Sequence, residues 1–216
     1  MILGIYGSGG LGREIYELAR RCSKERWQDI VFIDDYNAEG PFFGTRRMKF
    51  ETMLENKNDY ECIIAIGEPS SREKLFKKLT DENIRIATII DPSSIVSPTA
   101  TIGQGVIICE FTTIHTHVEI ANNVLIQPFC DIGHDIKIGN HSVISPFCAP
   151  GGNIIFGERV YIGMKSSLIE KITVGNDVIV GMGSAVFRDV PDGATVVGNP
   201  ARITKGNDEH KVFSSR

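Results

Sequence analysis

The sequence predicts a chain in two parts, a small α/β unit followed by a parallel β-helix, on three observations. Strand and helix patterns alternate up to about residue 90. From residue 90 an apolar residue recurs at every sixth position, and a six-residue repeat is typical of a parallel β-helix. The third observation is length and composition: 216 residues, 42% hydrophobic and 23% charged, allow one large or two small globular domains.

The first 89 residues predict a parallel sheet covered by helices, because short apolar strands alternate with amphipathic segments. Strands are predicted at Ile2–Tyr6, Ile30–Asp35, Cys62–Gly67 and Arg85–Asp91. Helices are predicted at Gly12–Arg21, where apolar residues recur on one face, and at Ser70–Asn83, which opens with two capping serines. The segment 36–58 is polar and irregular, and its pattern predicts no defined element.

The repeat region keeps its period over 17 hexads without an insertion. Fifteen of the recurring residues are Ile, Leu or Val, and Gly often follows directly. The recurring positions are Ile90, Val96, Ile102, Ile108, Ile114, Ile120, Ile126, Ile132, Ile138, Ile144, Pro150, Phe156, Ile162, Leu168, Val174, Val180 and Val186. Three hexads make a triangular coil of 18 residues, so residues 90–191 predict between five and six coils stacked at ~4.8 Å.

Residues 18 apart form columns of similar side chains, as stacking requires. The column from residue 90 to residue 180 is Ile or Val throughout, and the column from Thr112 to Ser184 contains only small residues. Cys130 and Cys148 belong to that second column, so we interpret them as small inward residues and not as catalytic thiols. The five cysteines lack CxxC spacing, which predicts a reducing, cytoplasmic protein without a disulfide framework or a zinc site.

The unbroken hexads and the segment Val197–Ala201 resemble the hexapeptide-repeat acyltransferases, whose β-helix is left-handed. Residues 6–12 (YGSGGLG), 32–35 (FIDD) and 65–67 (AIG) resemble, more narrowly, the sialic acid O-acetyltransferase family. The resemblance implies a Rossmann-like nucleotide-sugar-binding domain at 1–89, a left-handed β-helix acyltransferase domain at 90–203 and a polar tail at 204–216, which we expect to be loose. It further implies N-acetylation of a UDP-linked 4-amino sugar in bacterial glycan biosynthesis.

The glycine loop Gly7-x-Gly9-x-x-Gly12 follows a strand and opens a helix, where exposed backbone N–H groups favour a phosphate. Asp34 and Asp35 end the next strand, where carboxylates can accept hydroxyls of a ribose or sugar. The alternative is a tight turn that binds no ligand, and 89 residues are too few for a full dinucleotide fold. The family resemblance implies that the UDP-sugar contacts are Gly9, Gly10, Asp34, Asp35 and Gly67. Some relatives have His where this chain has Leu11.

His134 is the candidate general base for acyl transfer, a reaction that must remove a proton from the attacking amine or hydroxyl. It lies two residues after the inward Ile132, so its side chain should point outward. The position matches the catalytic His of the family, and Asp135 matches the acidic residue that supports it. Gly152 follows 18 residues later and should lie ~5 Å away, leaving open space beside the imidazole. The alternative for His134 is an ordinary surface residue in a turn.

Acetyl-CoA is the co-substrate that the family resemblance implies, lying along the β-helix between neighbouring subunits of a homotrimer. The matching positions are Gly152, Gly163, Met164, Gly181 and Met182. Met164 and Met182 are one coil apart, where flexible apolar side chains could line a pantetheine channel. Subunit packing is the alternative role for these two residues. Direct attack on the thioester is expected, since the sequence places no nucleophile for an acyl-enzyme.

Several other functions are disfavoured or remain as alternatives. A net charge of −4 disfavours nucleic-acid binding, and the apolar runs are too short for a membrane span. The N-terminus lacks a signal-peptide pattern. No metal is expected, although His115, His117 and His134 share one corner and are the alternative metal site. A hexapeptide-type carbonic anhydrase, which needs three histidines that share zinc across subunits, is a separate alternative. O-acetylation of sialic acid or a capsular sugar and a non-catalytic sugar-binding β-helix are the two further alternatives.

Overall fold

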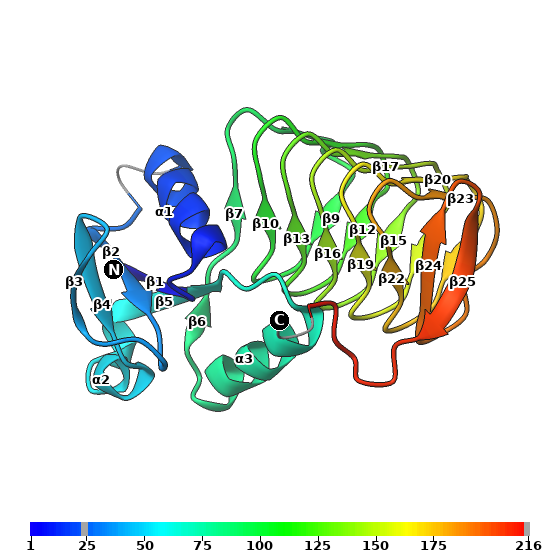
Figure 1. Ribbon diagram of the computed structural model, residues 1–216. Helices are drawn as coiled ribbons and strands as arrows, with labels where there is room; N and C mark the ends of the chain where they lie inside the picture. Colours follow the sequence, from blue (N-terminus) through cyan, green and yellow to red (C-terminus); the bar gives the residue numbers. More distant parts are fainter. Residues whose placement is uncertain (23–25, 214–216) are drawn as a thin grey trace.

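The computed structural model describes residues 1–22 and 26–213. A small sheet with helices lies at one end of the molecule, and a stack of coils extends from it (Figure 1). An α/β sheet followed by a parallel β-helix of hexapeptide coils is thus confirmed as the fold class.

The N-terminal sheet has the strand order β3-β4-β2-β1-β5-β6. Its central strand β1 pairs in parallel with β2 on one side and with β5 on the other, so the strand order reverses at β1. Ligands of open α/β sheets bind at the carboxyl ends of the strands beside such a reversal. The elements are β1 (Ile2–Tyr6), α1 (Gly10–Cys22), β2 (Asp29–Ile33), β3 (Gly40–Phe42), β4 (Thr45–Met48), α2 (Phe50–Leu54), a 3-10 turn at Lys57–Asp59, β5 (Tyr60–Ile64), α3 (Pro69–Asp81) and β6 (Arg85–Ile86).

Two parts of this unit differ from the sequence prediction. The segment 36–58, for which no element was predicted, supplies β4 parallel to β2 and the antiparallel edge strand β3, so the sheet is mixed and not all-parallel. The single strand predicted at Arg85–Asp91 is wrong, because the chain changes sheets there. Arg85 and Ile86 complete the N-terminal sheet, whereas Ile89 and Ile90 begin the first coil of the β-helix and pair with Ile107 and Ile108 of the next coil.

The β-helix consists of two-residue strands that pair with strands 18 residues away, as in Ile108 with Ile126. Three faces result, each following one strand of every coil. The first face contains β7 (Ile89–Ile90), β10 (Ile107–Ile108), β13 (Leu125–Ile126), β16 (Val143–Ile144), β19 (Tyr161–Ile162) and β22 (Ile179–Val180). The second contains β8 (Ile95–Val96), β11 (Thr113–Ile114), β14 (Asp131–Ile132), β17 (Ala149–Pro150), β20 (Ser167–Leu168) and β23 (Ala185–Val186). The third contains β9 (Thr101–Ile102), β12 (Glu119–Ile120), β15 (Lys137–Ile138), β18 (Ile155–Phe156) and β21 (Thr173–Val174).

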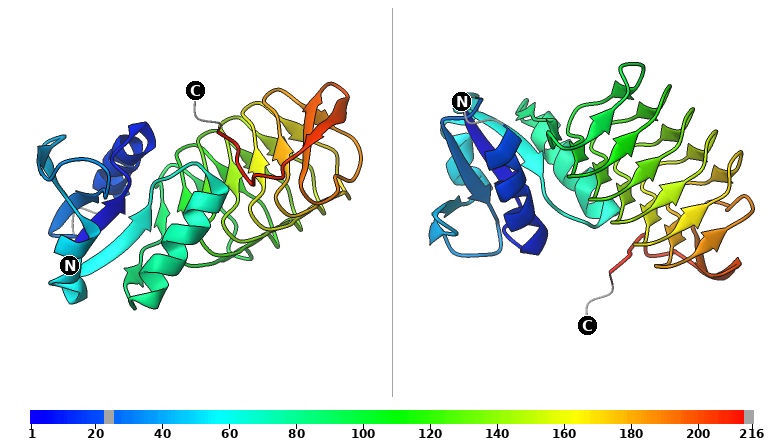
Figure 2. Two further views of the ribbon diagram at one scale, coloured as in Figure 1. Left: turned by 60° about the horizontal axis from the view of Figure 1, so that its bottom comes forward. Right: turned by 90° about the horizontal axis from the view of Figure 1, so that it is seen from above.

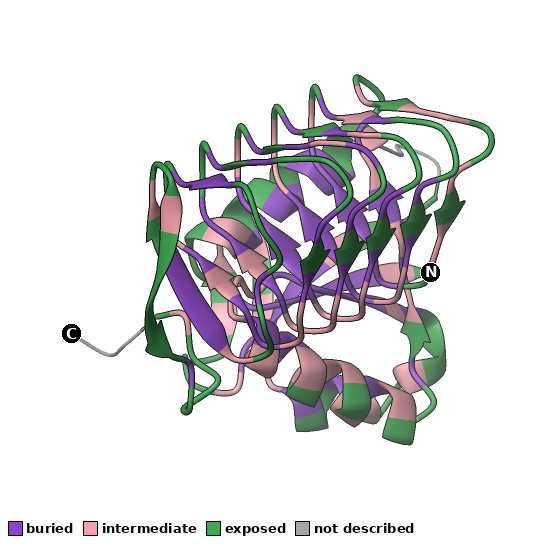
Figure 3. Ribbon diagram, turned by 90° about the vertical axis from the view of Figure 1, so that its right-hand side faces the viewer, coloured by how far each residue is buried: buried purple, intermediate pink, exposed green. Residues whose placement is uncertain are grey.

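The recurring apolar residues point into the coils and form one core there, from Val106 to Val196 (Figure 3). Between two faces the chain turns a sharp corner, and from Gly105 to Gly183 one residue at each corner has positive φ. These residues recur every six positions, as at Asn123 (φ 56), Phe129 (φ 61) and Asp135 (φ 56). The left-handed conformation is uncommon outside glycine, so its regular recurrence marks the corners. Each hexad therefore contains one inward apolar residue and one corner residue at fixed positions.

The first face is covered by the N-terminal unit (Figure 2). The outward residues Ile107, Leu125 and Val143 are buried in the same apolar cluster as Leu3 of β1 and Ile15 of α1. The α/β unit and the β-helix therefore share a hydrophobic core, which fixes one against the other.

The C-terminal segment closes the far end and then runs back along the molecule. β24 (Ala194–Gly198) extends the first face in parallel to β22, and β25 (Ala201–Gly206) pairs with β24 antiparallel. Residues 207–213 return to α3, where Val212 N and Phe213 N donate to the Glu68 carboxylate. The expectation of a loose tail is therefore wrong through residue 213, and residues 214–216 lie outside the described part of the chain. No helix among the described residues has the length and apolar character needed to cross a membrane.

Candidate active site

His134 lies at the corner between the second and third faces, where the predicted outward direction leaves its side chain 53% exposed. Its Nδ1 lies 2.7 Å from Asp135 Oδ2. Since a carboxylate accepts at that distance, Nδ1 carries the proton and Nε2 presents its lone pair outward. Asp135 can form this contact because its positive φ, 56°, turns its side chain back towards the preceding residue. This arrangement is that of a general base held by a carboxylate.

Gly152 lies directly against the imidazole, one coil further along. A Cβ added at Gly152 would come within 2.6 Å of both Cε1 and Nε2 of His134. Any larger residue would displace the ring, so the glycine is what lets the imidazole lie flat on the next coil. The buried Gly152 N–H also has no hydrogen-bond partner among residues 1–22 and 26–213. The corner therefore combines a free imidazole nitrogen with a free backbone donor.

The glycine loop between β1 and α1 divides into two pairs of glycines. A Cβ at Gly12 would meet Gly7 O at 2.0 Å, and a Cβ at Gly7 would meet Ala65 O at 2.8 Å, so these two are required for close packing. By contrast, Gly9 and Gly10 are exposed, and a Cβ at either would meet no atom within 4 Å. They lie at the start of α1, where backbone N–H groups point out of the helix. The open pair is thus the part of the loop available to an anion.

A pocket of about 340 Å³ opens at the carboxyl ends of β1, β2 and β5, the place that the strand order predicts for a ligand. Its lining includes Asp34 and Asp35, but Gly9, Gly10 and Gly67 lie outside it. Asp34 is only 8% exposed, and both of its oxygens accept hydrogen bonds within the chain, from Ser8, Asn37 and the backbone of Tyr36. Burial alone would raise the pKa of Asp34, but these hydrogen bonds outweigh it and hold that pKa well below its usual range. Asp34 therefore orders the loop after β2.

Asp35 forms a polar cluster with Tyr6 and Lys78 at the wall of the pocket. Lys78 Nζ lies 2.8 Å from both the Asp35 carboxylate and the Tyr6 hydroxyl, and that hydroxyl donates to Asp35 over 2.5 Å. Burial opposes ionisation of Asp35, yet the bonds from Lys78 and Tyr6 prevail and lower its pKa. Burial and the Asp35 contact raise the pKa of Tyr6 far above its usual value, so the hydroxyl stays a neutral donor.

The sequence analysis missed three residues that line this pocket: Tyr36, Lys74 and Lys78. Tyr36 is 99% exposed at the mouth, as an aromatic ring available for stacking. Lys74 and Lys78 are one helical turn apart on α3, so both reach the same side of the helix. The four-residue spacing of the two lysines was visible in the sequence, but nothing local showed that α3 would turn that face towards the ends of the strands.

The predicted CoA positions lie on two different corners. Gly152 is beside His134, whereas the other four residues lie at the corner between the first and second faces. There, a Cβ at Gly163 would meet the backbone N of Met182 at 2.6 Å, so close stacking of these two coils requires Gly163. A Cβ at Gly181 would meet a side-chain atom, Val197 Cγ2, at 2.8 Å. Met164 and Met182 are 42% and 67% exposed, one coil apart, as the column arithmetic predicts.

The remaining histidines have separate surroundings. His115 Nε2 pairs with Asp131 over 2.8 Å, one coil from His134. His141 packs on Phe76 of α3 with ring centroids 5.3 Å apart, and burial lowers its pKa. Among the residues that the structure describes, no three His, Cys, Asp or Glu side chains are placed to hold a metal ion together.

The pocket and the histidine corner do not meet within one chain. The α3 side of the pocket packs on the corner between the third and first faces, where Arg72 contacts Asn123 and Glu73 contacts Arg159. His134 lies at the next corner along the coil, between the second and third faces. The pocket and His134 are therefore positioned by different corners of the β-helix.

Both the α/β unit and the repeat region match known protein families. The model of the PglD N-terminal domain matches residues 3–79, and the model of the bacterial transferase hexapeptide, six repeats, matches residues 117–149. The solved structure of WeeI from Acinetobacter baumannii AYE is 30% identical to this chain and superposes with a TM-score of 0.88. That alignment covers 94% of this chain and 100% of the relative.

The chain belongs to the PglD-like family of hexapeptide-repeat acetyltransferases. The resemblance found in the sequence is thereby confirmed. Another PglD-like structure, the acetyltransferase domain of PglB from Neisseria gonorrhoeae FA1090, was solved in complex with acetyl coenzyme A. It is 28% identical, covers 94% of this chain and 98% of that chain, and has a TM-score of 0.87.

A curated relative, the GDP-perosamine N-acetyltransferase of Escherichia coli O157:H7, is 31% identical over 128 residues. The match covers 55% of this chain and spans only 56% of the relative's length. The name of this relative gives a GDP-linked sugar as its substrate, whereas the family resemblance in the sequence implied a UDP-linked sugar.

Proposed function

We propose that this protein transfers an acetyl group from acetyl-CoA to the amino group of a nucleotide-linked amino sugar. The observation that carries the proposal is His134, with Nδ1 on Asp135 and Nε2 free beside Gly152. Two relatives support the donor and the acceptor class: PglB holds acetyl coenzyme A, and the curated relative N-acetylates GDP-perosamine.

The reaction follows from the histidine geometry. The sugar amine attacks the thioester carbonyl carbon and forms a C–N bond, while its proton passes to His134 Nε2. The carbonyl oxygen becomes an oxyanion, for which the free Gly152 N–H is the donor we assign. The C–S bond then breaks, and the CoA sulfur takes the proton back from Nε2. Asp135 holds the imidazole and stabilises its cationic form while that proton is present.

The substrate would bind with its nucleotide in the pocket of the α/β unit. Lys74 supplies positive charge there, while Lys78 is paired with Asp35. Tyr36 supplies an exposed ring, and the open Gly9–Gly10 pair lies at the start of α1. Our more specific proposal is a UDP-linked 4-amino sugar. GDP is the competing nucleotide because the curated relative is named for it.

A homotrimer is part of this proposal, because pocket and His134 lie at different corners of one chain. Acetyl-CoA would lie along the β-helix between subunits, near Met164 and Met182 of one chain. Mixing two inactive variants tests this arrangement. His134→Ala and the pocket variant Lys74→Glu, refolded together, should regain activity only if one chain's pocket serves another chain's histidine.

The test of the activity is release of the CoA thiol from acetyl-CoA with UDP- and GDP-linked 4-amino sugars as acceptors, run separately. His134→Ala should lower kcat by at least about a hundredfold. His115→Ala is the matched control, since His115 also pairs with an aspartate on the same corner and should leave kcat within about twofold. Wild-type turnover by His134→Ala would refute the mechanism. Activity with sialic acid alone would show that the acceptor is a sugar hydroxyl, so N-acetylation would be rejected in favour of O-acetylation.

A further inference from the structure

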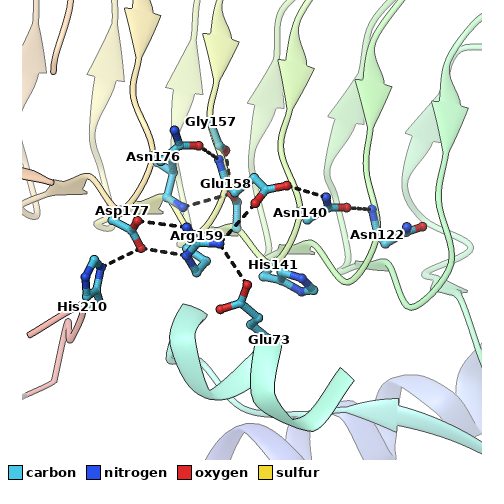
Figure 4. Close-up of polar contacts among 12 residues, drawn as sticks. Glu73, Asn122, Asn140, His141, Gly157, Glu158, Arg159, Asn176, Asp177 and His210 are labelled. Carbon is cyan, nitrogen blue, oxygen red and sulfur yellow. Dashed lines mark hydrogen bonds and ion pairs between the residues drawn. The ribbon is translucent and has the colours of Figure 1, made fainter. Parts of the chain in front are cut away.

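The C-terminal strap, residues 207–213, is anchored at one end to the β-helix. Asn207 Nδ2 donates to the backbone oxygen of Asp177 over 3.0 Å, and His210 Nδ1 lies 3.0 Å from the Asp177 carboxylate. Arg159 holds the other side of that carboxylate with two bonds, of 2.8 and 3.0 Å (Figure 4). Its Nη1 continues to Glu73 of α3 over 3.0 Å. One polar network therefore ties the strap, the β-helix corner and α3 together.

The other end of the strap is held by Glu68, the residue before α3. Its carboxylate accepts the backbone N–H groups of Val212 and Phe213, at 3.0 Å each. These are backbone bonds to a charged acceptor, so they fix the path of the strap independently of its side chains. Glu68 directly follows Gly67, and the strap consequently ends at the loop after β5.

This anchoring places the ring of Phe213 beside the glycine loop. A Cβ at Gly67 would lie 3.8 Å from Phe213 Cε2 and 3.9 Å from Leu11 in the first turn of α1. On its other side Phe213 meets Tyr161 of β19 edge to face, with ring centroids 5.5 Å apart. Phe213 as a whole residue is nevertheless 57% exposed. An aromatic ring that is held on two sides and open on another is available to a ligand.

We infer that Phe213 is a substrate-contact residue that forms the wall of the nucleotide-sugar site on the side facing the β-helix. The pocket with Lys74 and Lys78 takes the nucleotide, so the sugar extends past Gly67, which has no side chain to block it, and packs its C–H face on the Phe213 ring. The inference rests on the proposed function and adds a specificity element that the C-terminal strap supplies.

Equilibrium binding of a nucleotide amino sugar and of the free nucleoside diphosphate, measured by calorimetry on the full chain, tests the assignment. Phe213→Ala should weaken binding of the nucleotide sugar about tenfold and leave the diphosphate unchanged within about twofold. In kinetics the KM for the nucleotide sugar should rise by the same factor, with the KM for acetyl-CoA unchanged. Phe213→Trp should retain wild-type binding. Val212→Ala is the matched control, because it trims the neighbouring side chain and keeps both bonds to Glu68.

The outcomes separate this inference from the proposed function. If the wild type acetylates a nucleotide amino sugar and Phe213→Ala changes neither binding nor KM, Phe213 is no substrate contact and the activity stands. An equal loss of diphosphate and nucleotide-sugar binding would overturn the assignment to the sugar. If the wild type binds the nucleotide sugar without acetylating it, the proposed function fails, while the binding comparison still decides the role of Phe213. A wild type that binds no nucleotide sugar would overturn both.

Discussion

The carboxylate of Asp135 determines which nitrogen of the neighbouring imidazole is free. We expect Asp135→Asn to lower kcat about tenfold, because an amide cannot stabilise the cationic imidazole that forms during transfer. Steady-state rates at saturating acetyl-CoA measure the effect. Asp131→Asn is the control, since Asp131 pairs with His115 over a similar distance of 2.8 Å and should have wild-type kcat. Equal losses in both variants would assign the effect to surface charge and not to the His134 contact.

Asp34 should contribute to stability through its hydrogen bonds in the loop after β2. Asp34→Asn is expected to lower the free energy of unfolding by about 2 kcal/mol at neutral pH. The pKa of Asp34 in the folded protein is depressed, so its contribution is present above the unfolded pKa and lost as the pH falls. The difference between variant and wild type should therefore shrink below about pH 4.

Urea denaturation at several pH values measures this difference. Asp29→Asn serves as the control, because the Asp29 side chain is 48% exposed and lies 3.9 Å from Arg46. It should change stability by less than about 0.5 kcal/mol. A stability difference for Asp34→Asn that does not depend on pH would contradict an ionised Asp34 in the fold.

Among the elements of the β-helix, Gly152 and Gly139 both face a neighbouring coil, but we expect one to matter for activity and the other for stability. The three atoms nearest to a Cβ at Gly152 all belong to the exposed His134 ring, whereas a Cβ at Gly139 would lie 2.3 Å from Gly157 O in the next coil. Gly152→Ala should therefore keep the melting temperature within a few degrees and lower kcat at least about tenfold, as the ring is displaced. Gly139→Ala should lower the melting temperature, since the backbone of a coil must move. Thermal unfolding and kcat of both variants test this contrast, which a reversed result would contradict.

The sequence predicted β1, α1, β2, β5 and α3 as separate elements, but only for the repeats could it also predict which residues contact each other. Period six identified the inward residues, and period 18 identified which residues stack, so Gly152 could be placed beside His134 from counting alone. The segment that forms β3, β4 and α2 has no such period. The place of β4 depends on pairing with β2, which lies outside that segment, and the edge strand β3 pairs with β4. The sequence prediction also joined β6, which ends at Ile86, and β7, which begins at Ile89, into one strand. The two belong to different sheets because their partners lie in distant segments.

For the whole molecule, Arg72 is a buried residue that joins the two parts by hydrogen bonds. It is fully buried, and its guanidinium donates to the backbone oxygens of Ile64, Ile66 and Asn123. Burial lowers the pKa of Arg72 to about 9, so it remains charged at neutral pH. Arg72→Met should cost about 3 kcal/mol of unfolding free energy, because it leaves buried carbonyl groups without donors.

Chemical denaturation of Arg72→Met measures that cost. Arg46→Met is the matched control, because the Arg46 side chain is 53% exposed and its nearest carboxylate is 3.9 Å away. A cost for Arg72→Met no greater than that of the control would show that the junction does not depend on its hydrogen bonds. No spacing in the sequence foretold this residue, or the strap that carries Phe213, because both depend on contacts between distant segments.

The apolar cluster that runs from β1 and α1 into the first face limits how the α/β unit or the β-helix can be exchanged between related proteins. A β-helix transplanted without its N-terminal unit would expose Ile107, Leu125 and Val143 in a row, an apolar patch that invites aggregation. A unit borrowed from another protein would need to match that row, and also supply a partner for Asn123. The α/β unit and the β-helix therefore cannot be exchanged as separate modules unless the residues on both sides of this shared core change together.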